Sequence, residues 1–244
     1  MKLRSRFLAR VLLVLLACLG VGAAAQAANL QISPVTIHLR AEQGAVGINL
    51  QNLGDQPMYG QVRVFAWDQR NGEEVLAPTQ ELVASPPIVE IAANSRQTIR
   101  LVRARPGPVA QEKTYRVLID EVSREDDTGR SGVDIRLRYS VPVFVLPSGA
   151  AGKEILDWKV YRQDGEWMLR ISNSGTFHAQ IGALTLTNRN GKEFVISKGL
   201  FGYVLAQRMR VWRLPVAREA ELDGPLSMTV NVNAKALVAQ NSTP

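Results

Sequence analysis

The stretch that most constrains the fold is 133–146, with the sequence VDIRLRYSVPVFVL. Its first half alternates between apolar and polar residues, which is the period of a β-strand with one apolar face. Its second half is apolar at nearly every position, as in a strand that enters a core. Pro142 has no N–H to donate and favours an edge strand or a bulge. The alternating apolar row consists of Val133, Ile135, Leu137, Tyr139 and Val141. An edge with such a row needs a cover, which is either another part of this chain or another protein.

The first 27 residues have the pattern of a secretory signal peptide. A basic segment without acids precedes the apolar run 11–21, and Ala25-Gln26-Ala27 offers a small-residue cleavage site. The run is too short to predict a membrane span. Leu15-Leu16-Ala17-Cys18 also resembles a lipoprotein box, but the apolar stretch continues past Cys18 to the better site. We therefore expect export and a mature chain that begins at Ala28.

Removal of this leader changes the charge and the cysteine count. The chain carries a net charge of +7, and loss of the four leader cations leaves +3 on the mature protein. This modest charge gives little support to a nucleic-acid partner. The single cysteine, Cys18, leaves with the leader. An exported chain without cysteine cannot form a disulfide, so its cores must hold it together.

Short alternating segments separated by turn residues follow from Leu30 onward, and none has helical periodicity. Pro34 breaks the first segment, and Asn71-Gly72 is a strong signal for a two-residue hairpin. The segments before Pro147 are 31–39, 46–50, 58–67, 88–91, 97–102, 115–121 and 133–146. Seven strands at this spacing predict an immunoglobulin-like sandwich over residues 28–147.

The small-residue stretch 147–152 predicts a linker between two domains. A second domain is expected over residues 153–240, with hairpin turns at Asp164-Gly165 and Asn190-Gly191. Its predicted strands are 155–161, 167–171, 177–187, 194–196, 211–214 and 226–232, followed by a frayed tail after Lys235. The fold class is therefore all-β, with two immunoglobulin-like β-sandwich domains joined by a short linker.

The sequence offers little for catalysis, metal binding or a cofactor. His38 and His178 lie in alternating segments, where a structural role is expected. The mature chain has no cysteine, no Gly-rich phosphate loop and no G-x-S-x-G motif. The acidic run Glu125-Asp126-Asp127 is expected to be a solvated loop rather than a calcium site. We therefore expect a protein that is not an enzyme and binds no cofactor and no metal.

Several motifs, in this order and spacing, make the mature chain resemble the periplasmic pilus-assembly chaperones of the chaperone–usher family. The motifs are Ser85-Pro86-Pro87, Ile99-Arg100-Leu101, Tyr115-Arg116-Val117 and the strand 133–144. Within the family, Arg138-Tyr139-Ser140-Val141-Pro142 and Phe201-Gly202-Tyr203-Val204-Leu205 are most similar to the archaic branch.

The resemblance implies a function for the alternating strand. It would complete a pilin-like subunit that lacks its own last strand, with Val133, Ile135, Leu137, Tyr139 and Val141 filling the groove of the subunit. The implied partners are pilin-like subunits and an outer-membrane usher. Whether the free protein hides this edge by self-association stays open.

The sequence departs from the family at the site that binds the C-terminal carboxylate of the subunit. Better-known members place an arginine and a lysine where this chain has Thr36 and Pro142. We expect one buried cation to bind this carboxylate. The candidates are Arg100, which we rank first because it lies between the apolar Ile99 and Leu101, and then Arg116 and Arg138.

An exported immunoglobulin-type binding or adhesion module is the alternative function. A sugar-binding module should carry aromatic residues on loops. The tryptophans instead fall in or beside predicted strands, where core packing is expected, at Trp67, Trp158, Trp167 and Trp212.

Overall fold

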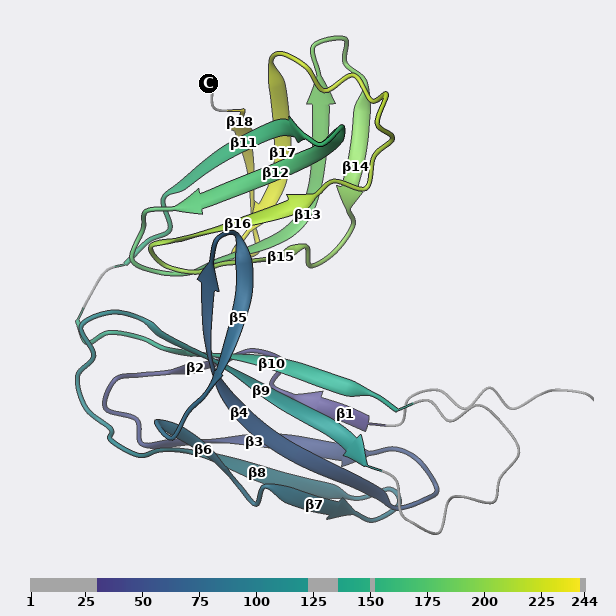
Figure 1. Cartoon of the computed structure of the whole chain (residues 1–244). Coiled ribbons are helices and arrows are strands. Elements are labelled where there is room, and N and C mark those ends of the chain that lie inside the picture. Colours follow the sequence, from purple (N-terminus) through teal and green to yellow (C-terminus); the bar gives the residue numbers. More distant parts are fainter. Residues whose placement is uncertain (1–29, 123–135, 150–151, 242–244) are drawn as a thin grey trace, which may run out of the picture.

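The computed structural model describes residues 30–122, 136–149 and 152–241. In these segments the chain forms only β-strands and connecting loops, so the predicted all-β fold is confirmed. The strands build two sandwiches that lie one above the other in Figure 1. Strands β1–β10 form the N-terminal sandwich and strands β11–β18 form the C-terminal sandwich.

The N-terminal sandwich packs two sheets face to face. One sheet has the strand order β1-β3-β8-β6, and the other has the order β2-β10-β9-β4-β5, with β7 paired to β4. The strands are β1 (Leu30–Ser33), β2 (Ile37–Leu39), β3 (Ala45–Asn52), β4 (Met58–Arg70), β5 (Glu73–Pro78), β6 (Leu82–Ser85), β7 (Ile88–Ile91), β8 (Arg96–Arg103), β9 (Lys113–Val122) and β10 (Arg138–Val145). Pro34 breaks the first predicted strand, and the two pieces, β1 and β2, join different sheets.

The C-terminal sandwich also has two sheets, with the orders β11-β12-β16 and β14-β13-β17-β18, and β15 pairs with β13. Its strands are β11 (Leu156–Gln163), β12 (Glu166–Asn173), β13 (Ala179–Asn188), β14 (Glu193–Ser197), β15 (Gly202–Val204), β16 (Arg208–Arg213), β17 (Leu226–Val232) and β18 (Lys235–Gln240). The expectation of a frayed tail after Lys235 was wrong, because β18 pairs with β17 over its whole length. Its side chains are mostly exposed, so the hydrophobic pattern gave no signal for this edge strand.

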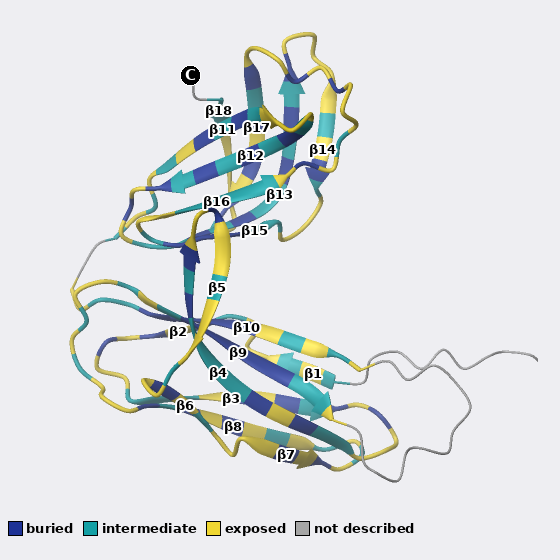
Figure 2. Ribbon diagram, in the orientation of Figure 1, coloured by how far each residue is buried: buried dark blue, intermediate teal, exposed yellow. Residues whose placement is uncertain are grey.

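Each sandwich has its own core, formed by the inward-facing residues of its two sheets (Figure 2). Ile48, Ile99 and Val117 are among the fully buried side chains of the N-terminal core, and Leu169, Ile181 and Met228 are among those of the C-terminal core. Trp67, Trp158 and Trp167 are buried, and Trp212 packs against the C-terminal core. The expected packing role of the tryptophans is confirmed.

The predicted hairpin at Asn71-Gly72 is confirmed, and it reaches far beyond its own sandwich. Asn71 and Gly72 have φ values of 53° and 82°, the left-handed conformation that a type I′ turn requires. The β4–β5 hairpin rises from the N-terminal sandwich and touches β16 of the other (Figure 1). It therefore connects the two halves of the molecule.

Candidate functional site

Strand β10 is paired on both edges only near its C-terminal end. Its full length, Arg138–Val145, pairs antiparallel with β9. Strand β2 pairs with the opposite edge, but only over Val143–Val145. Within the described part of the chain, no strand pairs with that edge of Arg138–Pro142. The predicted edge strand is therefore an edge over its first half and an interior strand over its second half.

Burial along the apolar row of β10 decreases toward the open end (Figure 2). Val143 and Val145 are fully buried and Val141 is 4% exposed, whereas Tyr139 and Leu137 are half-buried. The row is continuous with the N-terminal core. It therefore extends an apolar surface from that core toward a part of the strand that has an unpaired edge.

The structure places the predicted binding residues at different positions relative to this open end. Leu137 and Tyr139 lie at the open end, and the Tyr139 side chain packs against the N-terminal core. Val141 already belongs to that core, so it offers little surface to a partner in this structure. Val133 and Ile135 lie outside the described residues.

The three candidate arginines differ sharply in their surroundings. Arg100 is exposed on β8, in the sheet that does not contain β10, so the expectation that it is a buried cation was wrong. Alternation along β8 explains this error, because the neighbours Ile99 and Leu101 point into the core and turn Arg100 outward. Arg138 is exposed and forms an ion pair with Asp120, which also pairs with Arg63. Of the three, only Arg116 is buried.

Arg116 lies on β9 directly opposite Pro142 of β10. Its guanidinium carbon is 3.7 Å from the ring centre of Trp67 and 5.3 Å from that of Tyr203, which belongs to the other sandwich. The nearest carboxylate oxygen of the described chain, Oε1 of Glu74, is 3.6 Å from Arg116. Burial lowers the pKa of Arg116, while the charge of Glu74 and the Tyr203 hydroxyl act in the opposite direction. A guanidinium remains charged at neutral pH in spite of such a shift.

Two donor groups at this position lack a good acceptor. The 3.6 Å separation between Arg116 and Glu74 is too long for a strong hydrogen bond. The indole N–H of Trp67 is buried and has no hydrogen-bond partner within the described residues. Buried donors without acceptors are rare in native proteins and often mark a place that a ligand or water completes. The chemistry of the two donors suits an oxygen anion.

The two sandwiches meet in an apolar cluster beside Arg116. The cluster consists of Trp67, Phe144, Tyr203 and Leu205, with Leu146 packed against it. The side chain of Gln69, next to it on β4, donates a hydrogen bond of 2.8 Å to the carbonyl of Tyr203 and accepts one of 3.0 Å from the N–H of Leu205. Because Gln69 is 2% exposed, these buried contacts fix β15 against β4.

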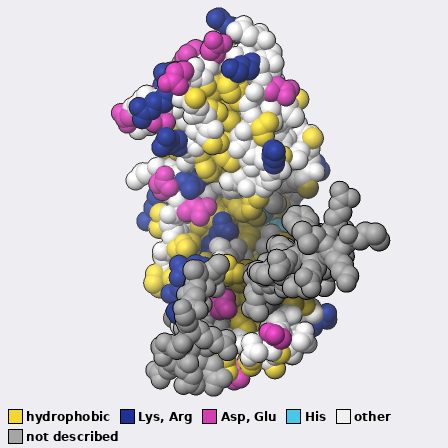
Figure 3. Space-filling view, turned by 90° about the vertical axis from the view of Figure 1, so that its right-hand side faces the viewer, with side chains coloured by type: hydrophobic (Ala, Val, Ile, Leu, Met, Phe, Trp, Pro, Cys, Tyr) yellow, Lys and Arg dark blue, Asp and Glu magenta, His cyan; other side chains and the backbone are white. Residues whose placement is uncertain are grey.

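A second set of contacts at the junction joins His178 to the buried carboxylate of Glu112 and stacks His38 nearby. Glu112 accepts a hydrogen bond of 2.8 Å from the backbone N–H of His178, and its other carboxylate oxygen lies 2.8 Å from Nδ1 of the His178 ring. The His178 ring stacks on Phe144, and His38 stacks beside them with its centroid 5.5 Å from that of Phe144. A histidine side chain is visible between the two sandwiches in Figure 3. These contacts support a structural role for both histidines.

The tip of the β4–β5 hairpin completes the junction. The carbonyl of Gly72 accepts a 3.0 Å hydrogen bond from the N–H of Val211 on β16. A Cβ at Gly72 would lie 2.7 Å from a methyl carbon of Val211, so this approach requires glycine. Asp68 and Glu73 form ion pairs with Arg208 and Arg210, at 2.6 and 2.9 Å. The sequence predicts the turn but not its contact with the C-terminal sandwich, because a turn signal contains no information on distant neighbours.

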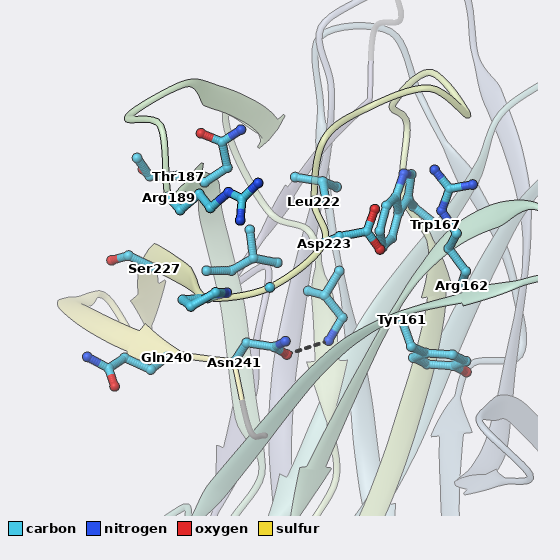
Figure 4. A pocket seen from close by; sticks show the side chains of 15 residues that line it. Tyr161, Arg162, Trp167, Thr187, Arg189, Leu222, Asp223, Ser227, Gln240 and Asn241 are labelled. Atoms are coloured by element: carbon cyan, nitrogen blue, oxygen red, sulfur yellow. Dashed lines mark hydrogen bonds between the residues drawn. The ribbon is translucent and has the colours of Figure 1, made fainter. Parts of the chain in front are cut away.

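A cavity of about 730 Å³ lies in the C-terminal sandwich, away from this junction (Figure 4). Its lining includes Tyr161, Trp167, Arg189 and Asp223. Trp167 already donates its indole N–H to the carbonyl of Ala220, and Asn241 accepts the N–H of Val160. These two polar groups are thus used in holding the sandwich together.

Neither metal clusters nor membrane-spanning helices are found in the described segments. No group of three or more His, Cys, Asp or Glu side chains there is arranged to hold a metal ion. No helix in those segments is long and apolar enough to cross a membrane.

Fold and junction together define a class of two-sandwich, immunoglobulin-like proteins with a strand that, among the described residues, is unpaired along half of one edge. Residues 29–151 match the family described as pili and flagellar-assembly chaperone, PapD N-terminal domain. Because the match covers half of the chain, the protein belongs to this family of chaperones.

Individual relatives are more distant. The probable fimbrial chaperone YadV of Escherichia coli K12 is 24% identical over 180 residues, which are 69% of this chain and 72% of that protein. This chain also superposes on a chain in the crystal structure of the CsuC–CsuE chaperone–tip adhesion subunit complex, from the archaic Csu pili of Acinetobacter baumannii. The TM-score is 0.68 and the sequence identity is 24%, and the match covers 88% of this chain and 98% of that one. The YadV crystal structure gives a TM-score of 0.62 at 18% identity, with 87% and 98% covered. These structural similarities show that this chain has the same two-sandwich fold as those solved chains.

Proposed function

We propose that this protein is a periplasmic chaperone that binds pilin-like subunits through the open edge of β10 and delivers them to an outer-membrane usher. The unpaired edge of Arg138–Pro142 carries the proposal, because it presents backbone groups and an apolar row at the same place. A partner that lacks one strand can pair with this edge and bury the apolar side chains, which is recognition by β-strand addition.

The apolar side chains proposed to enter the subunit are those of the row Val133, Ile135, Leu137, Tyr139 and Val141. Each fully buried aliphatic side chain contributes roughly 1.5–3 kcal/mol before the cost of ordering is subtracted. Val141 contributes least in this scheme, because the core of the chaperone already buries it.

The C-terminal carboxylate of the subunit is proposed to bind Arg116, which replaces Arg100 as our first candidate. The guanidinium of Arg116 and the indole N–H of Trp67 both lack a good acceptor, and both are buried at the junction. Charge-assisted hydrogen bonds between a guanidinium and a carboxylate are among the stronger interactions available in such a place. Arg138, which already pairs with Asp120, is a weaker candidate.

Residues 28–147 and 153–240 are proposed as the two domains, and residues 1–27 as the leader that directs export. Removal of that leader should give a protein that starts at Ala28 and has no thiol. Intact-mass measurement and a thiol assay on periplasmic material test this proposal. A lipid-modified Cys18 at the N-terminus would contradict it.

The function is tested by isolating the tagged full chain from the periplasm of its source organism and identifying the bound proteins by mass spectrometry. We expect pilin-like subunits in stoichiometric amounts. A protein that carries only unrelated chains, or that binds a glycan array with no subunit present, would contradict the proposal and favour an adhesion module.

A further inference from the structure

Glu74 is the one carboxylate of the described chain that forms an ion pair with Arg116. It lies on β5, opposite Gln69 of β4, while Arg116 lies on the other side of β4, opposite Phe65. The Arg116 side chain therefore extends across β4, over Trp67, toward Glu74. The pair is asymmetric, because the Arg116 side chain is 11% exposed and that of Glu74 is 38% exposed.

This arrangement affects any carboxylate that comes to Arg116. A buried guanidinium is costly without a nearby negative charge, so Glu74 stabilises Arg116 in the free protein. A second carboxylate at Arg116 would lie close to Glu74 and would be repelled by it. Glu74 thus favours the ligand-free state of Arg116 and disfavours the state in which a second carboxylate is bound there.

The surrounding structure holds Glu74 near this position. Its neighbour Glu73 pairs with Arg210, and the preceding Gly72 is hydrogen-bonded to Val211, so the start of β5 is attached to the C-terminal sandwich. Backbone pairing with β4 continues from Glu73 to Pro78. The side chain of Glu74 is 38% exposed, so it can turn toward solvent when a ligand arrives while its backbone stays in place.

We propose that Glu74 is a resident counter-ion for Arg116 that weakens the hold of the site on an incoming carboxylate and so keeps binding reversible. This inference rests on the proposed function, in which the carboxylate is the C-terminus of a pilin-like subunit. A chaperone must release what it binds, and a resident counter-ion at the anchor weakens the complex without changing the donated strand.

The probe is sodium acetate, titrated against the full mature chain at low ionic strength and followed by the NMR signals of the arginine Nε–H groups. Acetamide serves as the uncharged control for the probe. Glu74→Gln keeps the shape of the side chain and removes its charge, and we expect it to bind acetate about 3- to 10-fold more tightly than the wild type at Arg116. The effect should shrink at high salt, because screening reduces the repulsion.

Glu73→Gln is the matched control, since it removes the same charge one residue away on a side chain that pairs with Arg210. It should leave acetate binding nearly unchanged. Arg116→Ala should abolish the acetate-dependent shift in the wild type and in the Glu74→Gln background alike.

Acetate binding that is equal or weaker in Glu74→Gln overturns the inference, as does an equal gain in Glu73→Gln. Both results leave the chaperone function untouched if pilin-like subunits still copurify with the wild type. Loss of that copurification would instead contradict the proposed function itself.

Discussion

The imidazole ring of His178 lies flat against the ring of Phe144, with centroids 3.4 Å apart and planes inclined by 4°. His178 directly precedes β13 of the C-terminal sandwich, and Phe144 belongs to β10 of the N-terminal one. Val143 and Val145, on either side of Phe144, point into the N-terminal core. One end of β10 is thus fixed between two sandwiches, whereas its other end has an edge with which no described strand pairs. A strand held in this way can offer its free half to a partner without losing its place in the fold.

The buried amide of Gln69 should be important for the docking of the two sandwiches. Gln69→Ala removes the partners of the Tyr203 carbonyl and the Leu205 N–H, and an unsatisfied buried polar group costs about 1–3 kcal/mol. We expect a lower midpoint in urea unfolding. Gln61→Ala changes the same residue type at an exposed position of the same strand and should have no such effect. Equal midpoints for the two variants would show that Gln69 does not hold the junction.

Stability should decrease as the pH falls through the range in which histidine titrates, and His38 should cause part of this decrease. Burial lowers the pKa of His38 below its ordinary value of 6.5, the charge of His178 lowers it further, and Glu112 acts in the opposite direction. Below pH 6.5 the unfolded chain therefore takes up a proton at His38 more readily than the folded protein does. Proton uptake then favours unfolding, so the stabilising contribution is complete above pH 6.5 and is lost at lower pH.

His38→Gln removes this titration. Urea unfolding of wild type and variant at pH 7.5 and at pH 5.5 measures the difference. We expect a smaller loss of stability in the variant over this interval. If the variant loses as much stability as the wild type or more, groups other than His38 cause the pH dependence.

Arg116→Ala should release bound subunit, and Arg100→Ala should not. Leaving a buried carboxylate without its cation costs about 2–5 kcal/mol, which corresponds to at least a 10-fold weaker complex. Arg100 is the matched control, because it is exposed in the sheet that does not contain β10. The measurement is the amount of subunit retained on the tagged chaperone, together with the melting temperature of each variant alone. Subunit loss in Arg100→Ala at an unchanged melting temperature would restore Arg100 as the anchor.

The sequence predicted most of the strands in which side chains alternate between a core and solvent, but it missed the short strand β6, whose side chains also alternate. Strand β10 is the best case, because the change from alternation to a continuous apolar run coincides with the change from its open half to its buried half. The prediction was wrong for the tail after Lys235, since β18 is a mostly exposed strand and leaves no apolar pattern. Pairing with β17 through the backbone holds that strand, and backbone hydrogen bonds are not encoded in residue type.

The expectation that Arg100 is buried was wrong for a related reason. Arg100 has apolar neighbours in the sequence, but in a strand the adjacent residues point to the opposite face. Arg116 is buried through contacts with Trp67, Glu74 and Tyr203, which are distant in sequence. These contacts of Arg116 can be recognised only in the folded structure, where the hairpin β4–β5 and the strand β15 lie beside β9.

The variants Leu137→Arg and Val141→Arg should show that the open end and the buried half of β10 have different roles. Leu137 is half-buried just before the strand, near its open end, whereas Val141 is 4% exposed and packs in the N-terminal core. A charge at a half-exposed site near an open edge changes stability little, by about 0.5 kcal/mol, and a charge in a core is strongly destabilising. We therefore expect Leu137→Arg to melt within a few degrees of wild type yet retain no subunit, because the new charge would lie in the subunit groove. Val141→Arg should instead melt far lower or fail to fold. Thermal melting of each variant alone and copurification of subunit are the two measurements. If Leu137→Arg also collapsed the fold, the first half of the apolar row would belong to the core of this protein, and no open surface would remain for the donated strand.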